Sequence, residues 1–598
     1  MSAVTTSTVR SLLAGVMAIA VVLAVLLAVP DTARAQATPA DPTVPSDVGD
    51  AVALALAWSA LIPDGSVDTV LLGTTRSFAD SLAAGGVQAL DAGGPLLLHD
   101  EGTVLDARVA DEIDRLGASR VVILGGTAAI SEEVATTLED DYDVERVAGP
   151  GRRETAVETA RRFFDAPAEA IVVRADGDAD VPTRGFIDAL GAGTLSGTIG
   201  APILLNSTAT LDDVVRDYLQ ATPSITEVTI VGGNGAISRD TEQALRDLDL
   251  RVSRSGGATR HETAALVALD VRTATSPSED GRRPLIIDGN DDLAWASGLP
   301  ASFHGNILLL ANGDDATAPT IRTVLGVQNQ DDAVRCGPLV STTACAEARA
   351  AEDAMQFDSE VTLLETVLDG YQEVPAVATD AWGTAGLWVG PDYTCVQATV
   401  AYESGPLTGF HLHAADRGDN GDVVIPFSTE EYLFDLADCA TGLDTALAQA
   451  IATEPSDFYL NMHTEANPSG EIRGQAHALA DDLFSSLAGD QVVPAGTGLE
   501  NRGGVVRIDR PEAGLLCWTS SANLSQDRVT SLTVHDGAEG ENGPAVIDLD
   551  HRSPEDGYGR CLEVDPNAAD ALFADPEAHY VLLSTENLPN GAIRGQLR

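Results

Sequence analysis

Four motifs occur twice, in the same order, in the first half of this 598-residue chain, and no other feature constrains its fold as strongly. Each motif returns 107 or 108 residues later, and this regularity indicates a tandem repeat rather than chance similarity. The paired segments are RSFADSLAAG (76–85) with RGFIDALGAG (184–193), GGPLLL (93–98) with GAPILL (200–205), ILGGTAAIS (123–131) with IVGGNGAIS (230–238), and RVAGPGRRETA (146–156) with RSGGATRHETA (254–264).

Continuous apolar runs alternate with amphipathic stretches throughout these repeats. The runs TVLLG, RVVILGG, AIVVRA, EVTIVGG and PLIIDG are rich in Val, Ile and Leu, and the intervals between them are long enough for a helix. Such runs are typical of strands in a parallel sheet that is covered on both faces. The sequence therefore predicts α/β repeats with parallel sheets over 47–165 and 166–280, after a short Pro/Asp-rich linker at 36–46.

A third, degenerate copy is predicted over 281–350. The stretch PLIIDGNDDLAWASGLPASFHGNILLL keeps the strand, helix and strand order, but Trp295 stands where the other copies have aspartate. Cys336 replaces one glycine of the later motif, and no R-x-E-T-A segment follows it.

Short alternating strands broken by Gly, Pro, Asp and Asn begin at about Val361, and they predict antiparallel sandwich or barrel domains. This region is also duplicated, because LDGYQEVP returns as LAGDQVVP and FYLNMHTEANPSGEIRGQ returns as HYVLLSTENLPNGAIRGQ. We therefore expect two all-β domains, over 361–478 and 479–598.

The cysteines follow the same duplication. Six cysteines in an exported chain are most simply three disulfides, and two of the intervals between them are both 44 residues long. Equal intervals indicate one equivalent bridge in each all-β domain, with the two remaining cysteines paired to each other. The predicted pairs are Cys395–Cys439, Cys517–Cys561 and Cys336–Cys345.

The N-terminal segment has the order of a secretory signal. An arginine precedes an apolar run from Leu12 to Val29, and Ala33 and Ala35 then form an A-x-A site. We expect residues 1–35 to be a signal peptide of a secreted protein that has no membrane contact after signal removal. The apolar run is also long enough for an uncleaved anchor, which is the alternative.

The charge of the chain excludes one class of partner. Its net charge is −56, with 91 acidic residues against 35 basic ones, and every basic residue is an arginine. Nucleic acids are therefore not expected as partners, because binding a phosphate backbone requires clustered basic residues. An acidic, solvated surface suited to salty surroundings is the simpler interpretation.

The N-terminal repeats resemble the cell-wall-binding repeat type 2 family, in which F-x-D-A-L, G-x-P-I-L-L, V-G-G-x-x-x-I-S and R-x-E-T-A segments recur. The resemblance implies a protein held noncovalently on the cell wall by repeats that bind an anionic wall polymer. Guanidinium groups suit phosphate or carboxylate, so the predicted polymer-binding residues are arginines of the R-x-E-T-A segments. The alternative is that these arginines pair with carboxylates between the repeats. They are Arg146, Arg152, Arg153, Arg254 and Arg260.

The C-terminal half resembles the chordin-type (CHRD) domain family. The pattern L-x-G-x-Q-E-V-P, H-x-H with an N-G loop, Y-x-N-x-H-T and G-E-I-R-G-Q carries the resemblance. It implies an extracellular all-β module and supplies no catalytic assignment. The ligand of these domains, including any protein partner, is not identified by the sequence.

Three histidines of the first CHRD-like domain are candidate metal ligands. His411 and His413 lie two residues apart and point to one face of a strand, and His463 is placed to join them. Three imidazoles suit copper or zinc, although the second copy has Thr533 and Ser584 in place of two of them. The alternative is that the histidines hydrogen-bond the following Asp/Asn loop and organise a strand turn.

These patterns predict a secreted, noncatalytic cell-surface protein that anchors to the wall through its repeats and displays two CHRD-like modules for binding or adhesion. No resident cofactor is expected apart from copper or zinc at the three histidines. The rival hypothesis is a copper/zinc-binding or superoxide-dismutase-like metalloprotein that uses these histidines.

Overall fold

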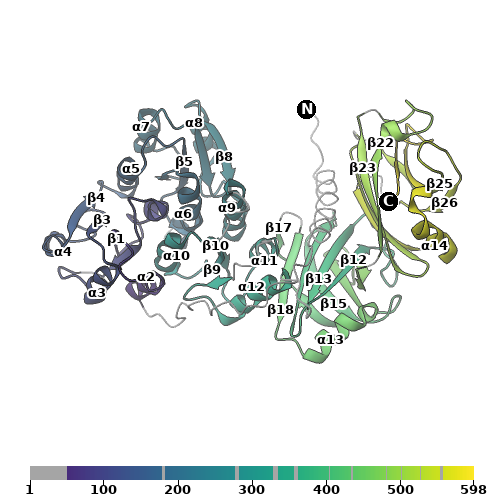
Figure 1. Cartoon of the computed structure of the whole chain (residues 1–598), viewed down its shortest axis with the longest axis horizontal. Coiled ribbons are helices and arrows are strands. Elements are labelled where there is room, and N and C mark those ends of the chain that lie inside the picture. The colour runs from purple at the N-terminus through teal and green to yellow at the C-terminus, as the bar shows by residue number, and fades with distance from the viewer. Residues whose placement is uncertain are drawn as a thin grey trace. The chain divides into compact units, whose positions relative to one another are not determined.

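The computed structural model describes residues 50–598 except 101, 178–181, 276–281, 327–333, 356–360, 403, 433–434, 480, 500, 525–526 and 552–556. The predicted signal peptide and linker therefore lie outside the described residues. The described chain falls into two compact units, one within Ala37–Gln356 and one within Phe357–Arg598 (Figure 1). Among the helices of the described segments, none is long and apolar enough to span a bilayer.

Three parallel sheets form the first unit, as the apolar runs predicted. The first two have the same strand order, and each places its first strand in the interior of the sheet. In sheet order, the strands are β2 (Leu96–His99), β1 (Thr69–Thr74), β3 (Arg120–Leu124) and β4 (Asp143–Val147); then β6 (Ile203–Asn206), β5 (Glu169–Arg174), β7 (Glu227–Val231) and β8 (Arg251–Ser255); then β10 (Ile307–Ala311), β9 (Pro284–Asp288) and β11 (Arg335–Cys336).

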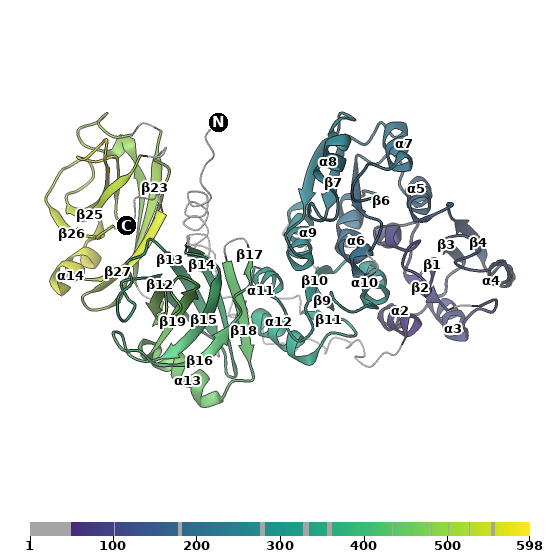
Figure 2. The same ribbon diagram turned by 180° about the vertical axis from the view of Figure 1, so that it is seen from behind.

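The second and third sheets are each covered by a helix that begins in the preceding repeat. Helix α5 (Arg152–Phe163) follows the first sheet and packs on β6, and α9 (Arg260–Ala274) follows the second sheet and packs on β10. The N-terminal α2 (Ala51–Ser59) covers β2 of the first sheet and contacts α10 (Ala294–Ala301) of the third unit (Figure 2). Helix α2 therefore covers the first sheet as α5 and α9 cover the next two, and its contact with α10 joins the first repeat to the third.

The equivalent segments of the three units meet at the centre of this arrangement. The rings of Phe78 and Phe186 lie 5.0 Å apart, and Phe78 and Trp295 lie 6.2 Å apart. Beside them, a Cβ added at Gly85 would lie 2.7 Å from the Cα of Gly193, so glycine is required for this approach. The central helix is α6 (Ile187–Ile199); the other helices of this unit are α3 (Ala107–Leu116), α4 (Glu132–Leu138), α7 (Asp213–Ala221), α8 (Arg239–Arg246), α11 (Ala318–Leu325) and α12 (Thr342–Met355).

Two antiparallel sheets with one shared strand order form the second unit, which confirms the predicted all-β class. Each sheet packs on an apolar core and carries one short helix, α13 (Thr445–Thr453) or α14 (Pro566–Ala574), and Trp382 and Ala401 of the first domain also pack into the core of the second. In sheet order, the first has β16 (Asp422–Phe427), β15 (Leu407–Ala414), β19 (Phe458–Thr464), β20 (Ile472–Gln475), β12 (Thr362–Asp369), β13 (Trp382–Val389), β14 (Tyr393–Ala401), β18 (Asp435–Thr441) and β17 (Glu431–Tyr432), with β21 (His477–Ala478) also on β12; the second has β26 (Ala545–Asp548), β25 (Val529–Asp536), β28 (His579–Thr585), β29 (Ile593–Gln596), β22 (Asp482–Ala488), β23 (Gly503–Glu512), β24 (Leu515–Ala522) and β27 (Gly557–Glu563).

Disulfides cross-link equivalent strand pairs in the two copies. Cys395 on β14 faces Cys439 on β18, and the sulfur atoms are bonded. Cys517–Cys561 joins β24 to β27 in the same way, and Cys336–Cys345 links β11 to α12 in the first unit. A bridge over 44 residues removes about 4 kcal/mol of unfolded-state entropy in the chain-entropy account.

Buried contacts also join the two all-β domains to each other. Arg507 of the second domain donates two hydrogen bonds to Glu365 of the first, and it also contacts Asp482 and Asp509. Burial raises the pKa of Asp509, while the positive charge of Arg507 lowers it. A single guanidinium therefore compensates three carboxylates at this junction.

We expect Arg507→Met to lower the free energy of unfolding of the second unit by about 3–5 kcal/mol, because it leaves buried carboxylates without their counter-charge. Chemical denaturation followed by tryptophan fluorescence measures the change. The matched control is Arg528→Met, whose exposed partner Glu586 lies 3.8 Å away; this change costs about 1 kcal/mol or less. Equal effects of the two variants would contradict the assignment.

Candidate functional site

The predicted polymer-binding arginines lie at the carboxyl ends of the parallel strands, where two of them bind backbone within their own unit. Arg146 on β4 donates Nη1 to the carbonyl of Gly125 at 3.0 Å, and Arg254 on β8 donates to Gly232 at 2.7 Å. Both glycines have positive φ, 100° and 118°, so their turns need glycine. The first arginine of each segment thus fixes the glycine turn of its own repeat.

Two further arginines connect one repeat of the first unit to the next repeat. Arg152 at the start of α5 donates Nη1 to the carbonyl of Ala175 at 2.7 Å, just beyond β5 of the second sheet. Arg260 at the start of α9 donates Nη1 to the carbonyl of Gly289 at 2.5 Å, just beyond β9 of the third sheet. Equivalent arginine–carbonyl hydrogen bonds therefore join the first repeat to the second and the second repeat to the third.

Carboxylates complete the surroundings of the remaining guanidinium groups. Arg153 donates Nε to Asp212 at 2.7 Å and also pairs with Asp176, and its side chain is one-quarter exposed. Arg254 pairs with Glu242 at 2.7 Å. The structure thus gives each predicted arginine protein partners, and polymer binding by these residues stays a prediction.

A cluster that the sequence analysis missed surrounds Asp188 of the F-x-D motif. This carboxyl is partly buried, and burial raises its pKa to about 6 against the opposing charges of Arg260 and Arg174. The pKa of Arg260 is lowered by its own burial and by the nearby charge of Arg184, while Asp188 and Asp288 act in the opposite direction. We call Arg174, Arg184 and Arg260 the arginine cluster. Arg184 was recognisable in the sequence, because it begins the repeated motif.

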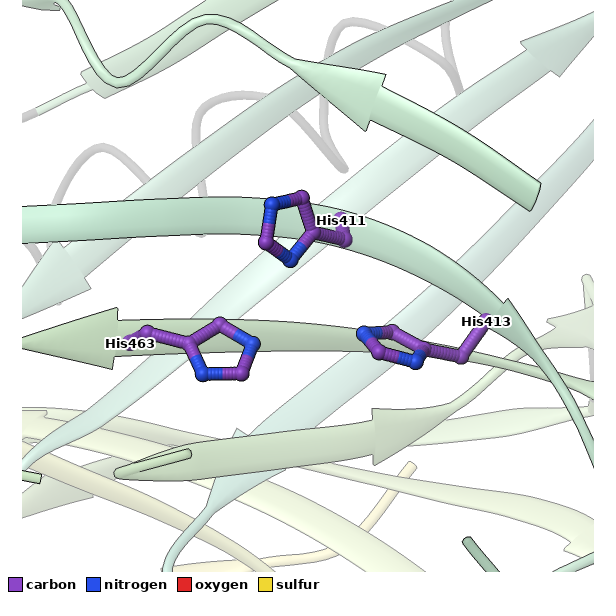
Figure 3. A group of neighbouring side chains, drawn as sticks. All are labelled: His411, His413 and His463. Atoms are coloured by element: carbon purple, nitrogen blue, oxygen red, sulfur yellow. The ribbon is translucent and has the colours of Figure 1, made fainter. Parts of the chain in front are cut away.

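The three candidate metal ligands converge in the first all-β domain. His411 and His413 lie on β15 and His463 lies on the neighbouring β19, where it faces Gly409 across the ladder. One ring nitrogen from each residue can be chosen so that all three lie within 4.8 Å of one another (Figure 3). The strand register therefore brings the three predicted ligands together.

Hydrogen bonds determine which ring nitrogens face the group. His413 Nδ1 lies 3.0 Å from the carbonyl of Gly421, and His463 Nδ1 lies 3.2 Å from that of Pro468. Since a carbonyl can only accept, both Nδ1 atoms carry the proton and both Nε2 atoms keep a lone pair. These Nε2 atoms, together with Nδ1 of His411, are buried without a hydrogen-bond partner.

Burial also keeps these imidazoles neutral. It lowers the pKa of all three histidines, and the charges of His463 and His413 lower that of His411 further. The hydrogen bonds to the carbonyls of Gly421 and Pro468 act in the opposite direction and are weaker. Neutral imidazole is the form that binds a metal.

A buried carboxyl near the histidines was also missed from the sequence. Asn461, between His463 and Tyr459 on the same face of β19, donates to Glu373 at 3.4 Å. Burial raises the pKa of Glu373 to about 7, although the charge of Arg473 opposes it. The repeat carried a signal for this site, because Q-E-V-P in the first copy becomes Q-V-V-P in the second.

Fold and sites define a protein of closed α/β repeats joined to a pair of antiparallel β domains, each of which contains its own disulfide. Residues 48–135 and 146–242 match the family model of Cell wall binding domain 2, and residues 364–476 and 483–597 match that of the CHRD domain. The chain therefore carries two cell wall binding domain 2 repeats and two CHRD domains, and both resemblances are confirmed. This composition fits a cell-wall-associated surface protein.

Individual relatives match parts of the chain. N-acetylmuramoyl-L-alanine amidase LytC of Bacillus subtilis is 24% identical over 284 residues, which are 46% of this chain and 52% of that protein. An uncharacterized protein of Pyrococcus horikoshii is 40% identical over 86 residues, 14% of this chain and 26% of its own. Among solved structures, Cwp8 from Clostridium difficile shares 21% identity at a TM-score of 0.43, over 51% of this chain and 50% of its own. The chain thus spans about half, or less, of each of these proteins.

The hydrogen bonds by which arginines join successive repeats should contribute to the stability of the first unit. Arg152→Met removes the hydrogen bond to Ala175, and we expect the free energy of unfolding of the repeat unit to fall by about 1.5–3 kcal/mol. Thermal unfolding of the full chain measures the change. Arg161→Met is the control, because Arg161 is half exposed, pairs with Glu158 one helical turn away and lies 5.9 Å from the ring centroid of Tyr218; there we expect about 0.5 kcal/mol or less. Unchanged stability of Arg152→Met would show that the tie is dispensable.

The raised pKa of Glu373 predicts that the free energy of unfolding of the second unit depends on pH. A raised folded pKa means that the protonated carboxyl is favoured in the folded state, so stability is greatest below the unfolded value and falls as pH rises through about 7. We expect Glu373→Gln to remove about 3 kcal/mol of this pH-dependent loss. Urea denaturation at pH 5 and pH 8 measures it, with the exposed Glu465→Gln as control. A wild-type chain whose stability changes no more than that of Glu373→Gln would contradict the burial assignment.

Proposed function

We propose that the chain is a secreted, noncatalytic surface protein whose repeat unit binds an anionic cell-wall polymer and whose CHRD domains are displayed for binding. The observation that carries the proposal is the match of two successive repeats to the wall-binding family, in a unit whose segments are tied to each other by equivalent arginines. Such a unit presents its repeated surfaces in a fixed arrangement. Weak contacts to successive polymer segments then add, because the first contact raises the effective concentration of the next.

The charge distribution supports an anionic ligand at one place in this unit. The chain as a whole carries a net charge of −56, which repels an anionic polymer. The arginine cluster brings positive charge together within this acidic chain, since Arg174 and Arg260 both act on Asp188 and Arg184 lies close enough to act on Arg260. We therefore propose that the first polymer contact is made at this cluster and that it includes Arg184, the first residue of the repeated motif.

Binding of the full mature chain to purified cell walls tests the proposal. We expect the protein to sediment with intact walls, to be released as ionic strength rises, and to remain in solution with walls from which the secondary polymers have been stripped. Arg184→Ser weakens binding in this account, whereas Arg161→Ser, outside the cluster, leaves it unchanged. Equal retention on stripped peptidoglycan would refute the anionic polymer as ligand.

A further inference from the structure

We propose that the first CHRD domain holds one copper or zinc ion on His411, His413 and His463, and that the second CHRD domain, built on the same scaffold, does not. This site is independent of wall binding, because it lies in the other compact unit. The proposal rests on the direction of three unpaired ring nitrogens and on a comparison of the two copies of the domain.

The unpaired nitrogens are the first observation. His413 is 8% exposed, and its Nε2 has no hydrogen-bond partner although its Nδ1 is firmly bound to Gly421. His463 repeats this arrangement with Pro468. A buried polar atom without a partner is costly, so its persistence needs an explanation. One bound cation would satisfy a nitrogen from each ring at the same time.

The carbonyl partners have the arrangement of second-layer groups at metal sites. A histidine that binds a metal usually donates its other ring N–H to a carbonyl or carboxylate, which fixes the tautomer and the ring orientation. Gly421 and Pro468 provide such acceptors for His413 and His463. The two Nε2 lone pairs are thereby fixed in a direction that suits a shared ion.

Space for the His411 ring depends on a glycine. A Cβ at Gly409 would lie 2.6 Å from Cε1 of His411 and 3.3 Å from Cδ2 of His463. Any other residue at this position would displace the first ring from the group. In the second copy the corresponding residue is Ser531, which faces Ser584 as Gly409 faces His463.

The second copy shows which contacts belong to the scaffold alone. His535, the counterpart of His413, keeps the bond from Nδ1 to a glycine carbonyl, that of Gly543, at 3.0 Å. It also keeps the stacking on a tyrosine, with ring centroids 5.0 Å apart for Tyr580 against 4.8 Å for Tyr459 beneath His413. Glycine bonding and tyrosine stacking therefore do not require a metal.

The difference between the copies lies at the other ring nitrogen. In the second copy, Nε2 of His535 lies 2.9 Å from the hydroxyl of Thr533, which occupies the position of His411. The second copy therefore satisfies this nitrogen with a protein hydrogen bond, and the first copy replaces that partner with a second imidazole. The Nε2 lone pairs of His413 and His463 cannot satisfy each other, whereas a metal ion accepts both together with a nitrogen of His411.

The donor set selects the chemistry of the ion. Among the described residues, the group consists of three histidines and includes no thiolate or carboxylate. Imidazole nitrogen suits copper and zinc, whereas calcium and magnesium require oxygen ligands. Three protein ligands leave a further coordination position for water or an exogenous ligand on a zinc ion.

Metal titration of the tag-free, full-length protein tests the site. After chelator treatment, equilibrium dialysis against Zn²⁺ or Cu²⁺ with elemental analysis should give one tightly held ion per chain. His411→Thr combined with His463→Ser, which installs the residues of the second copy, should reduce this to none. His535→Asn is the matched control and should keep one ion.

A gain-of-site variant makes the test independent of the folding of the first domain. Ser531→Gly, Thr533→His and Ser584→His together transfer the predicted ligands to the second copy, and we expect two ions per chain. A Co²⁺ absorption band in the visible region reports the new nitrogen-rich site directly. A wild-type chain that holds no ion, a double variant that still holds one, or a triple variant without a second ion would overturn the proposal.

Discussion

The requirement that a buried polar group must have a fixed partner organises both halves of this chain. In the repeat unit, guanidinium groups at equivalent positions donate to equivalent carbonyls, as Arg152 does to Ala175 and Arg260 to Gly289. In the CHRD domains, an imidazole in each copy bonds a glycine carbonyl eight residues later, and an arginine lies over the same tyrosine, Tyr459 or Tyr580. Because these partners recur wherever the sequence is duplicated, they identify the contacts on which each fold depends.

Contacts that do not recur point instead to function. At several positions the first CHRD domain has histidine, glutamate or asparagine where the second has serine, threonine or an apolar residue. These positions lie in one region of its sheet. Glu373 corresponds to Val492, and Asn461 corresponds to Leu582. Burying a polar group in place of a leucine or valine lowers the stability of the fold unless the group has a hydrogen-bond partner. The first copy therefore has less apolar packing in this region.

Much of this architecture was predictable from the sequence because duplication acts as an internal alignment. Period and apolar runs predicted the α/β and all-β classes, and the H-x-H spacing with His463 predicted a group that strand register then assembled. The roles of the arginines were not predictable, since the chain does not reveal that Arg152 reaches the carbonyl of Ala175 in the next sheet. The same applies to Asp188, because the folded repeats bring the charges of Arg174 and Arg260 to it. Long-range closure and backbone partners leave no periodic signal in a sequence.

Anomalous diffraction from crystals of the full-length protein, grown with zinc or copper, tests the histidine assignment most directly. The account predicts one strong anomalous peak bonded to nitrogens of His411, His413 and His463 at about 2.0–2.1 Å, and none beside His535. A map without a peak among these three rings, or with the ion on other ligands, would contradict it.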